Sequence, residues 1–361
     1  MKVLIMINNL AMGGAERLVV DDINEMLRRG IDVKLITLKL EKEKSLSPQC
    51  KIAPEQWIRI DFGSFLNLKS WFKVIKQINL FKPDVLIAHL WYSNVIGRIA
   101  GKICRIKNII IFEHNVYDTL KTKKMFFIDK WLQSFSDHIV AVSQAVKDSL
   151  LRHDIADKKI KVILNGIDIS KYLKPPENDI KKELGLEDKF VFIFIGRLIY
   201  QKGVDILLRA FQKVAEKTDK TSLLIVGEGD KKEELVGLSR ELVIDGKVHF
   251  LGLREDIVDL LLGSDCFVLP SRYEGLPMVL LEAVAARKPI IASDFDSASE
   301  IIQNNKNGII IPKEDPDQLA EAMASVFSDA AYRSKLEGNL ESLSRAVSVE
   351  NHIDKVLSLI R

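Results

Sequence analysis

The amino-acid sequence predicts an α/β protein with two domains, each built around a parallel β-sheet. Short apolar runs alternate with stretches of helical periodicity along most of the 361 residues. Alternation of strands and helices favours parallel sheets, because each helix carries the chain back to the start of the next strand. The chain is also too long for one ordinary hydrophobic core, so two domains of about 170 residues are expected.

A charged stretch with two consecutive prolines marks the expected boundary between the domains. Residues 171–188 contain Pro175 and Pro176, and the strand and helix pattern restarts after them. Polar segments that contain proline are typical of linkers. The sequence therefore predicts domains over residues 1–172 and 173–347.

The first domain opens with a strand, a glycine loop and a helix. Residues 2–7 are apolar, Gly13 and Gly14 end the loop, and residues 15–29 carry apolar side chains at helical spacing. Adjacent glycines let a backbone approach a ligand closely, although a plain tight turn would also use them. The spacing is not G-x-G-x-x-G, so the dinucleotide-binding fingerprint is absent.

Two histidines follow later strands of the first domain. His89 comes directly after the apolar run 85–88, and His114 follows the run 109–112. In an open parallel sheet, ligands bind beyond the carboxyl ends of the strands. The sequence therefore predicts that both histidines and the glycine loop lie at one edge of the sheet. A purely structural role is the alternative for each histidine.

Basic and aromatic residues are interleaved between residues 119 and 135. The lysines and the large apolar side chains are Lys121, Lys123, Lys124, Lys130, Met125, Phe126, Phe127, Ile128, Trp131 and Leu132. This combination suits contact with an anionic membrane surface. The alternative is a helix that packs its aromatic face into the core and holds its lysines in water.

Two cations follow the first strand of the second domain. Arg197 and Lys202 lie in a glycine-bounded loop between the apolar run 190–195 and a helix expected over residues 204–217. Cations next to a helix start form an anion site, for which a diphosphate is the natural occupant. Taken alone, such a pair is more often part of a solvated surface, but a second helix start on the same sheet supports the phosphate interpretation.

This second helix start belongs to a pattern of strand, loop, helix and strand around two glutamates. Glu274 lies in the loop, and Glu282 lies about one turn inside the helix. Backbone N–H groups near Gly275, Leu276 and Met278 are suited to binding phosphate. Glu282 could accept hydrogen bonds from a ribose diol, and Glu274 from sugar hydroxyls. The alternative is that both are surface acids, one of them favoured by the helix dipole.

Composition bounds the class of protein further. The net charge of +3 does not imply a nucleic-acid partner, and the three scattered cysteines predict neither disulfides nor a zinc site. This cysteine usage fits a reducing cytoplasm, and no apolar run approaches the roughly 20 residues of a membrane span. Residues 1–170 hold 27 basic and 18 acidic residues, against 26 and 32 in the rest. The basic first half suggests an anionic surface or substrate, with uneven solvated charge as the alternative.

Five sequence motifs, in this order along the chain, resemble those of the retaining glycosyltransferases of family 4. They are Gly13-Gly14-Ala15-Glu16, Asn165-Gly166-Ile167-Asp168, Gly196-Arg197-Leu198 with Lys202-Gly203, the E-x7-E pair of Glu274 and Glu282 within S-x2-E-G-x-P-x3-L-E-A, and Glu300. The resemblance covers almost the whole chain. The E-x7-E pair alone would be a weak signal, whereas five motifs in the right order are a strong one.

The resemblance implies the GT-B fold, in which two Rossmann-like domains have parallel sheets that face each other across a cleft. It implies that the first domain binds the acceptor and that the second binds the nucleotide sugar. The last helix of the family usually crosses back to the first domain. Residues 348–361 are therefore expected to pack there.

The resemblance also implies roles for individual residues. Arg197 and Lys202 would hold the donor diphosphate and stabilise the leaving group. Glu282 would bind the ribose, and Glu274 the hydroxyls of the donor sugar. His114 would lie near the donor sugar, and the glycine loop near the diphosphate.

The implied activity is retaining, metal-independent transfer of a hexose or N-acetylhexosamine from a UDP- or GDP-linked donor. The acceptor would be a lipid-linked glycan of the cell envelope, and no cofactor besides the donor substrate is implied. We expect a cytoplasmic protein with peripheral contact to the inner face of the membrane and no nucleic-acid partner. The alternatives are another GT-B enzyme that acts on a soluble sugar or nucleotide sugar, and a non-catalytic nucleotide-sugar binder.

Two positions depart from the family pattern. Arg287 stands where the family has the glycine of A-x-G-x-P, and Asp296-Ser297 replaces the glycine pair before Glu300. A glycine pair lets the backbone meet the donor, so donor contacts near Ser297 are expected to differ. Neither substitution removes a charged contact, and the expected activity is unchanged.

Overall fold

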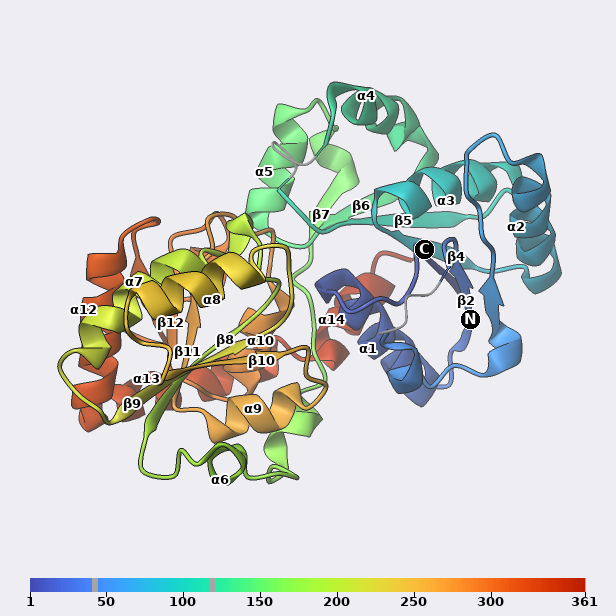
Figure 1. The fold of residues 1–361 in the computed structure, drawn as a ribbon. Coiled ribbons are helices and arrows are strands. Elements are labelled where there is room, and N and C mark those ends of the chain that lie inside the picture. Colours follow the sequence, from blue (N-terminus) through green and yellow to red (C-terminus); the bar gives the residue numbers. More distant parts are fainter. Residues whose placement is uncertain (41–44, 117–120, 361) are drawn as a thin grey trace. The chain divides into compact units, whose positions relative to one another are not determined.

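The computed structural model describes residues 1–40, 45–116 and 121–360 (Figure 1). The chain folds into two compact units. The first comprises Met1–Asp168 together with Ser348–Arg361, and the second comprises Ile169–Val347. Each unit contains its own parallel sheet with helices between the strands, which confirms the predicted α/β fold class.

The first unit contains a seven-stranded sheet in the order β3-β2-β1-β4-β5-β6-β7, and all neighbouring strands are parallel. The strands are β1 (Lys2–Ile7), β2 (Asp32–Thr37), β3 (Trp57–Arg59), β4 (Val85–His89), β5 (Asn108–Glu113), β6 (His138–Ala141) and β7 (Ile160–Val162). The central strands are continuous apolar runs because helices cover both faces of the sheet. The sequence analysis does not predict the short edge strand β3.

Helices cover both faces of this sheet, with α3 above it and α1 and α14 below it in the view of Figure 1. The helices are α1 (Gly14–Arg28), α2 (Leu68–Phe81), α3 (Trp91–Ile103), α4 (Lys123–Leu132), α5 (Gln144–Arg152) and α14 (Val349–Leu357), with single 3-10 turns at Ser47–Gln49, Pro54–Gln56, Gln133–Phe135 and Asp157–Lys159. Helix α3 packs between α2 and α4 and close to the sheet. A Cβ atom on Gly101 would lie 2.7 Å from the Cδ1 atom of Ile109, so a larger residue would require the Ile109 side chain to shift.

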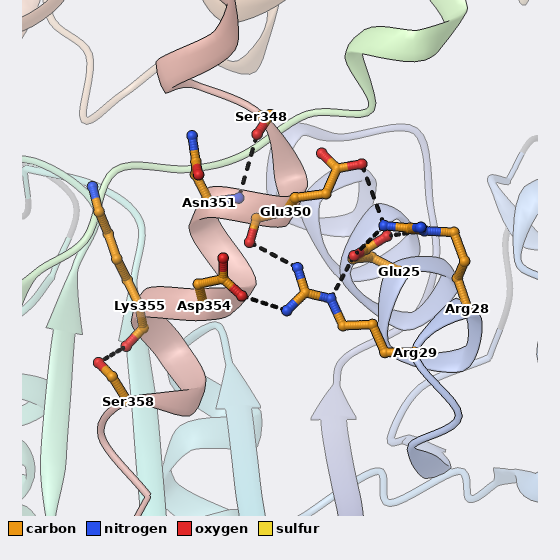
Figure 2. A network of polar contacts seen from close by, with 9 residues as sticks. All are labelled: Glu25, Arg28, Arg29, Ser348, Glu350, Asn351, Asp354, Lys355 and Ser358. Atoms are coloured by element: carbon orange, nitrogen blue, oxygen red, sulfur yellow. Dashed lines mark hydrogen bonds and ion pairs between the residues drawn. The ribbon is translucent and has the colours of Figure 1, made fainter.

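The last helix of the chain, α14, packs against α1 of the first unit (Figure 2). The Ser348 side chain caps its start by accepting a hydrogen bond from the Asn351 backbone N–H. Arg29 joins the two helices, because its guanidinium donates 2.5 Å hydrogen bonds to both Glu25 on α1 and Asp354 on α14. The helix cap and the contacts of Arg29 with both helices thus stabilise the packing of residues 348–360 against the first unit.

The second unit contains a six-stranded parallel sheet in the order β10-β9-β8-β11-β12-β13. The strands are β8 (Phe190–Ile195), β9 (Thr221–Val226), β10 (Val248–Gly252), β11 (Cys266–Leu269), β12 (Ile290–Ser293) and β13 (Ile309–Ile311). Its core holds fully buried aromatic side chains on both sides of the central strands, including Phe192, Phe194, Phe211 and Phe267. Strands β8 and β11 are neighbours at the centre of the sheet, which brings the loops at their carboxyl ends together.

The helices of the second unit fill the connections between these strands. They are α6 (Ile180–Leu184), α7 (Val204–Ala215), α8 (Lys232–Glu241), α9 (Ile257–Gly263), α10 (Met278–Ala285), α11 (Ala298–Ile301), α12 (Pro316–Ser328) and α13 (Ala330–Ala346), with 3-10 turns at Ile169–Leu173 and Tyr200–Lys202. The interpretation of residues 171–188 as a plain linker is wrong, because this stretch is folded into the second unit. The Asp259 carboxylate holds it by accepting hydrogen bonds from the backbone N–H groups of Glu177 and Asn178.

Candidate active site

Two loops of the second unit meet through an ion pair between residues that the sequence singled out separately. The Nζ atom of Lys202, from the loop after β8, lies 2.5 Å from the Oε1 atom of Glu274, from the loop after β11. The two side chains are 12% and 7% exposed. A buried carboxylate is costly unless its lone pairs are occupied, and Glu274 also accepts hydrogen bonds from Ser271 at 2.8 Å and from Gln201 at 3.4 Å.

This ion pair leaves Lys202 able to bind a second anion. An ammonium group carries three N–H donors, and the Glu274 carboxylate occupies one direction. The other predicted cation of this loop, Arg197, is exposed to solvent, and its guanidinium makes no ion pair with the residues that the structure describes. Two cations therefore follow β8: Lys202, which is largely buried, and Arg197, which is exposed.

A glycine allows the two loops to approach each other this closely. Gly203, directly before α7, has a φ of +64°, and a Cβ atom on it would lie 2.1 Å from the backbone oxygen of Pro270. A side chain at this position would both strain the backbone and push the loops apart. The last glycine of the G-x-x-x-x-x-K-G pattern in the first loop is therefore needed for packing against the second loop.

The start of α10 lies directly after the second loop. Gly275, Leu276 and Met278 are buried there, and Pro277 occupies the N-cap position without a capping side chain from the described residues. The first N–H groups of a helix have no partner within that helix, and together with the helix dipole they favour an anion. Glu282 is half-buried on the next turn of the same helix. The structure thus places all the donor-binding candidates of the second domain on two adjacent loops and one helix.

The structure describes the surroundings of both positions that depart from the family pattern, Arg287 and Ser297. Arg287 follows α10 with a φ of 53°, a left-handed conformation that glycine adopts without strain. It lies at the end of α10 opposite to Met278 and forms an ion pair of 3.4 Å with Glu341. Ser297 is fully buried, and its Oγ atom has no hydrogen-bond partner among the described residues.

In the first unit, the predicted glycine loop follows β1 and begins a helix. Gly13 is the N-cap residue of α1, in an extended conformation, and Gly14 is the first residue of the helix. A Cβ atom on Gly13 would lie 2.3 Å from a carboxylate oxygen of Glu16. The Glu16 side chain therefore occupies the space that a side chain at position 13 would need.

The two predicted histidines of the first unit contact each other. The Nδ1 atom of His89 lies 3.1 Å from the Nε2 atom of His114, and both residues are buried, His89 as the last residue of β4 and His114 directly after β5. Burial, followed by repulsion from neighbouring histidines, lowers the pKa of His114 to about 3 and lowers that of His89 well below its ordinary value. Both imidazoles are therefore neutral near pH 7 and act as hydrogen-bonding groups rather than as charges.

One expectation about the basic and aromatic stretch is wrong, because Lys121 does not lie at the surface. Its ammonium group is buried, 3.1 Å from a carboxylate oxygen of Glu113 and 2.8 Å from one of Asp129. Asp129 also accepts a 2.9 Å hydrogen bond from the fully buried Arg98 of α3. Thr119, at the start of the stretch, lies outside the described residues.

Sequence reasoning missed this buried charge network, which begins at Glu113, directly before His114. A signal was present, since Arg98 lies between apolar residues of α3 and Asp129 stands among the aromatic residues of α4. Charged side chains in such positions are almost never buried unless they are paired. The network ties α3 and α4 to the carboxyl end of β5, where His114 lies.

The described residues contain no group of histidine, cysteine or acidic side chains arranged to hold a metal ion. In the same part of the chain, no helix combines the length and the apolar character that crossing a membrane requires.

Comparison with known proteins agrees with this geometry. The family described as Glycosyltransferase Family 4 matches residues 12–171, and the family described as Glycosyl transferases group 1 matches residues 176–342. An uncharacterized glycosyltransferase of Methanocaldococcus jannaschii is 30% identical over 291 residues, which cover 74% of this chain and 72% of the relative. The Escherichia coli UDP-Gal:alpha-D-GlcNAc-diphosphoundecaprenol alpha-1,3-galactosyltransferase is 26% identical over 305 residues, covering 81% and 79%.

A solved structure is similar over nearly its whole length. The crystal structure of Anabaena HepE in complex with UDP and glucose matches with a TM-score of 0.87 at 22% identity, covering 99% of this chain and 98% of that one. Together with the two parallel α/β sheets, this likeness shows the GT-B fold. The matches to both halves and to the relatives are more specific, and the chain belongs to the family 4 glycosyltransferases.

Proposed function

We propose that this protein is a retaining, metal-independent glycosyltransferase that moves a hexose or N-acetylhexosamine from a UDP- or GDP-linked donor to a lipid-linked glycan of the cell envelope. The observation that carries the proposal is the largely buried Lys202–Glu274 pair between two loops, next to the start of α10. This arrangement offers a cation, a carboxylate and free backbone N–H groups to one ligand. A nucleoside diphosphate sugar has complementary groups for all three.

Donor binding follows from the chemistry of each group. Lys202 and Arg197 hold the diphosphate together with the N–H groups around Gly275, Leu276 and Met278. Glu282 accepts hydrogen bonds from the ribose, and Glu274 from hydroxyls of the donor sugar. Negative charge develops on the departing diphosphate, and preorganised cations there stabilise the transition state by about 2–4 kcal/mol each.

Sugar transfer proceeds at the front face of the donor sugar. The bond between the anomeric carbon and the diphosphate oxygen breaks, and the acceptor oxygen forms a bond to the same face of that carbon. The departing phosphate oxygen takes the proton of the acceptor hydroxyl, so no side chain has to act as a nucleophile. In this scheme the second unit binds the donor, and the first binds the acceptor. The neutral His114 hydrogen-bonds to the donor sugar, and Gly13 and Gly14 expose backbone N–H groups near the diphosphate.

A lipid-linked acceptor is supported by the E. coli relative, whose name gives a diphosphoundecaprenol-linked acceptor. The surface of α4 suits such an acceptor, because Phe127 and Trp131, one turn apart, are 73% and 66% exposed. The exposed side chains of Lys123, Lys124 and Lys130 border them. Aromatic and basic residues together favour the interface of an anionic membrane.

Helix α2, beside α3 on the same face of the sheet, has a second surface of this kind that the sequence did not single out. Leu68, Phe72 and Leu80 lie along one stripe of the helix at spacings of four and eight residues and are 80%, 69% and 66% exposed. The helix has no acidic residue and also exposes Lys69, Lys73 and Lys76. We propose that α2 and α4 are the membrane-facing helices of a cytoplasmic protein bound to the inner face of the membrane.

The proposal is tested with purified protein, a panel of UDP- and GDP-linked hexoses and N-acetylhexosamines, and a polyprenyl-diphosphate-linked sugar as acceptor. We expect nucleoside diphosphate release in the presence of EDTA, and a product with the anomeric configuration of the donor. Pelleting with vesicles that contain phosphatidylglycerol should capture the protein, and Phe72→Ser and Trp131→Ser should weaken capture. Turnover with a soluble sugar and no vesicle binding would instead favour a soluble acceptor, and tight nucleotide binding without turnover for any donor would favour a non-catalytic binder.

A further inference from the structure

Arg272 occupies the middle of the second loop, between Ser271 and Glu274, and the proposed mechanism gives it no role. Its side chain is only 9% exposed. All five N–H donors of the guanidinium are occupied by protein oxygens. Nε donates to Glu314 at 2.5 Å, Nη1 donates to the Tyr200 backbone oxygen at 2.6 Å and to Asp205 at 3.0 Å, and Nη2 donates to Asp205 at 2.8 Å and to Glu314 at 3.1 Å.

These contacts fasten the second loop to the first on both sides of Lys202. On one side, Arg272 binds the Tyr200 backbone oxygen, and its guanidinium carbon lies 3.9 Å from the centre of the Tyr200 ring. On the other side it binds Asp205, in the first turn of α7. Lys202, midway between Tyr200 and Asp205, is therefore held from both directions.

Gln201 completes the connection between the loops. Its backbone oxygen accepts a 2.8 Å hydrogen bond from the Arg272 N–H, and its side-chain nitrogen donates a 2.8 Å bond to the Tyr273 backbone oxygen. The same nitrogen lies 3.4 Å from the Glu274 carboxylate. The contacts of Arg272 and Gln201 thus connect the same two loops as the Lys202–Glu274 ion pair.

The surroundings of Arg272 show that this arrangement is kept against local strain. Glu314 adopts a left-handed conformation with a φ of 60° and still directs its carboxylate to the guanidinium. A residue other than glycine rarely adopts this conformation, because its Cβ atom crowds the backbone. Burial alone would raise the pKa of Asp205, but the hydrogen bond and charge of Arg272 lower it, so the carboxylate stays ionised.

We propose that Arg272 is a positioning residue for sugar transfer, which fixes Lys202 and Glu274 in the arrangement that the donor diphosphate sugar requires. It acts through the Tyr200–Lys202 turn and has no N–H donor left for a phosphate oxygen. Lysine cannot replace it, because a single ammonium group cannot span two carboxylates and a backbone oxygen in fixed directions. This inference rests on the proposed function of Lys202 and Glu274.

The test compares Arg272→Lys with Arg333→Lys in the full-length protein. Arg333 is a half-buried arginine of the same unit that donates to the Val326 and Phe327 backbone oxygens and lies over Phe190 at the amino end of β8, opposite to the active-site loops. We expect Arg272→Lys to lower kcat/KM for the donor about 10- to 100-fold, as misplaced catalytic groups do. Arg333→Lys should change kcat/KM less than about threefold even where it lowers the Tm.

A double-mutant cycle separates positioning from general stability. If Arg272 acts through Lys202, Arg272→Lys should cost less than about threefold once Lys202 is already Ala. An equal loss of activity in both backgrounds, or an Arg272→Lys variant as active as Arg333→Lys, would overturn the proposal. Glu314→Gly suits the left-handed backbone and removes one partner of Arg272, so it gives the same comparison should Arg272→Lys fail to fold. Absence of wild-type turnover with every donor would contradict the proposed function itself, and titration calorimetry with UDP and GDP would then show whether Arg272→Lys weakens nucleotide binding.

Discussion

The Nζ atom of Lys202 lies 2.5 Å from the Oε1 atom of Glu274, and this contact joins the loops that follow two neighbouring strands of the second unit. In the proposed mechanism Lys202 binds the donor diphosphate, and Glu274 binds the donor sugar that is transferred. A direct ion pair between them means that each residue fixes the position of the other before a donor arrives. Loss of one partner is therefore expected to affect both roles.

We predict that Glu274→Gln lowers both activity and stability. The glutamine keeps the shape of the side chain but leaves the half-buried Lys202 without its counter-charge, at a cost of about 1–3 kcal/mol in the free energy of unfolding. The kcat should fall about 100-fold, and urea unfolding should report the change in stability. Glu183→Gln, which removes an exposed partner of Arg254, is the control and should change stability by less than about 1 kcal/mol. A Glu274→Gln variant with full kcat would contradict the proposed role of the carboxylate.

We predict that the folded protein loses stability as the pH falls below about 6.5. His89 and His114 have lowered pKa values in the folded state, that of His114 being about 3. The unfolded chain binds protons at these histidines near pH 6.5 and the folded chain does not, so the free energy of unfolding drops by about 2 kcal/mol for His114 between pH 6.5 and 5, and His89 adds a loss in the same direction. Urea unfolding at a series of pH values measures this slope.

The variant His114→Asn should flatten that acid limb, whereas His153→Asn, in a histidine outside the pair, should not. The buried His352 acts in the opposite sense. Although burial lowers its pKa, the charge of the Asp22 carboxylate, 3.5 Å from its Nε2 atom, raises the pKa above the ordinary value, so its contribution is present at low pH and is lost as the pH rises through the raised pKa. An acid limb unchanged in His114→Asn would show that this histidine is charged or exposed in the folded protein.

We predict that two lysines only two positions apart differ sharply in their effect on stability. Lys121→Met leaves the buried carboxylates of Glu113 and Asp129 without their ammonium partner and should cost about 3–5 kcal/mol. Lys123→Met changes an exposed side chain and should stay within about 0.5 kcal/mol. If chemical denaturation showed that both substitutions lower the free energy of unfolding equally, Lys121 would instead be a surface residue.

We predict that Arg287→Gly stabilises the protein by about 0.5–1 kcal/mol. The arginine holds a φ of 53°, which costs a side-chain-bearing residue about 1–2 kcal/mol, and its ion pair with Glu341 is half-exposed and weak. The greater freedom of glycine in the unfolded chain offsets part of this gain. Arg345→Gly, within helix α13, should instead destabilise by about 1 kcal/mol. Destabilisation by Arg287→Gly, seen in thermal unfolding, would mean that the arginine has a packing role.

Much of the fold could be predicted because its signals are local. The run Phe190–Ile195 is buried along the sheet and therefore apolar throughout. The short edge strand Trp57–Arg59 gave no such signal, because three residues show no periodicity. The fold of the stretch 171–188 could not be predicted for a different reason, because its contact with Asp259 is set by tertiary structure.

The candidate site was predictable in its members but not in its contacts. The positions of Glu274 and Lys202 follow from motifs along the chain, whereas their ion pair depends on β8 and β11 being neighbours in the sheet. Arg272 has no signal of its own in one sequence, because an arginine in a loop is ordinarily solvated. Lys121 looked like the lysines that follow it, and only the fold brings Glu113 and Asp129 to it.

The most direct test of the account is nucleoside diphosphate release by wild type, Lys202→Ala and Lys181→Ala in one assay. Lys181 also forms a partly buried ion pair in the second unit, at 2.7 Å from Asp265, but on α6 and away from both loops. We predict that Lys202→Ala lowers kcat at least about 100-fold and that Lys181→Ala retains most of the activity. Equal release by wild type and Lys202→Ala would contradict the assignment of Lys202 to the donor diphosphate.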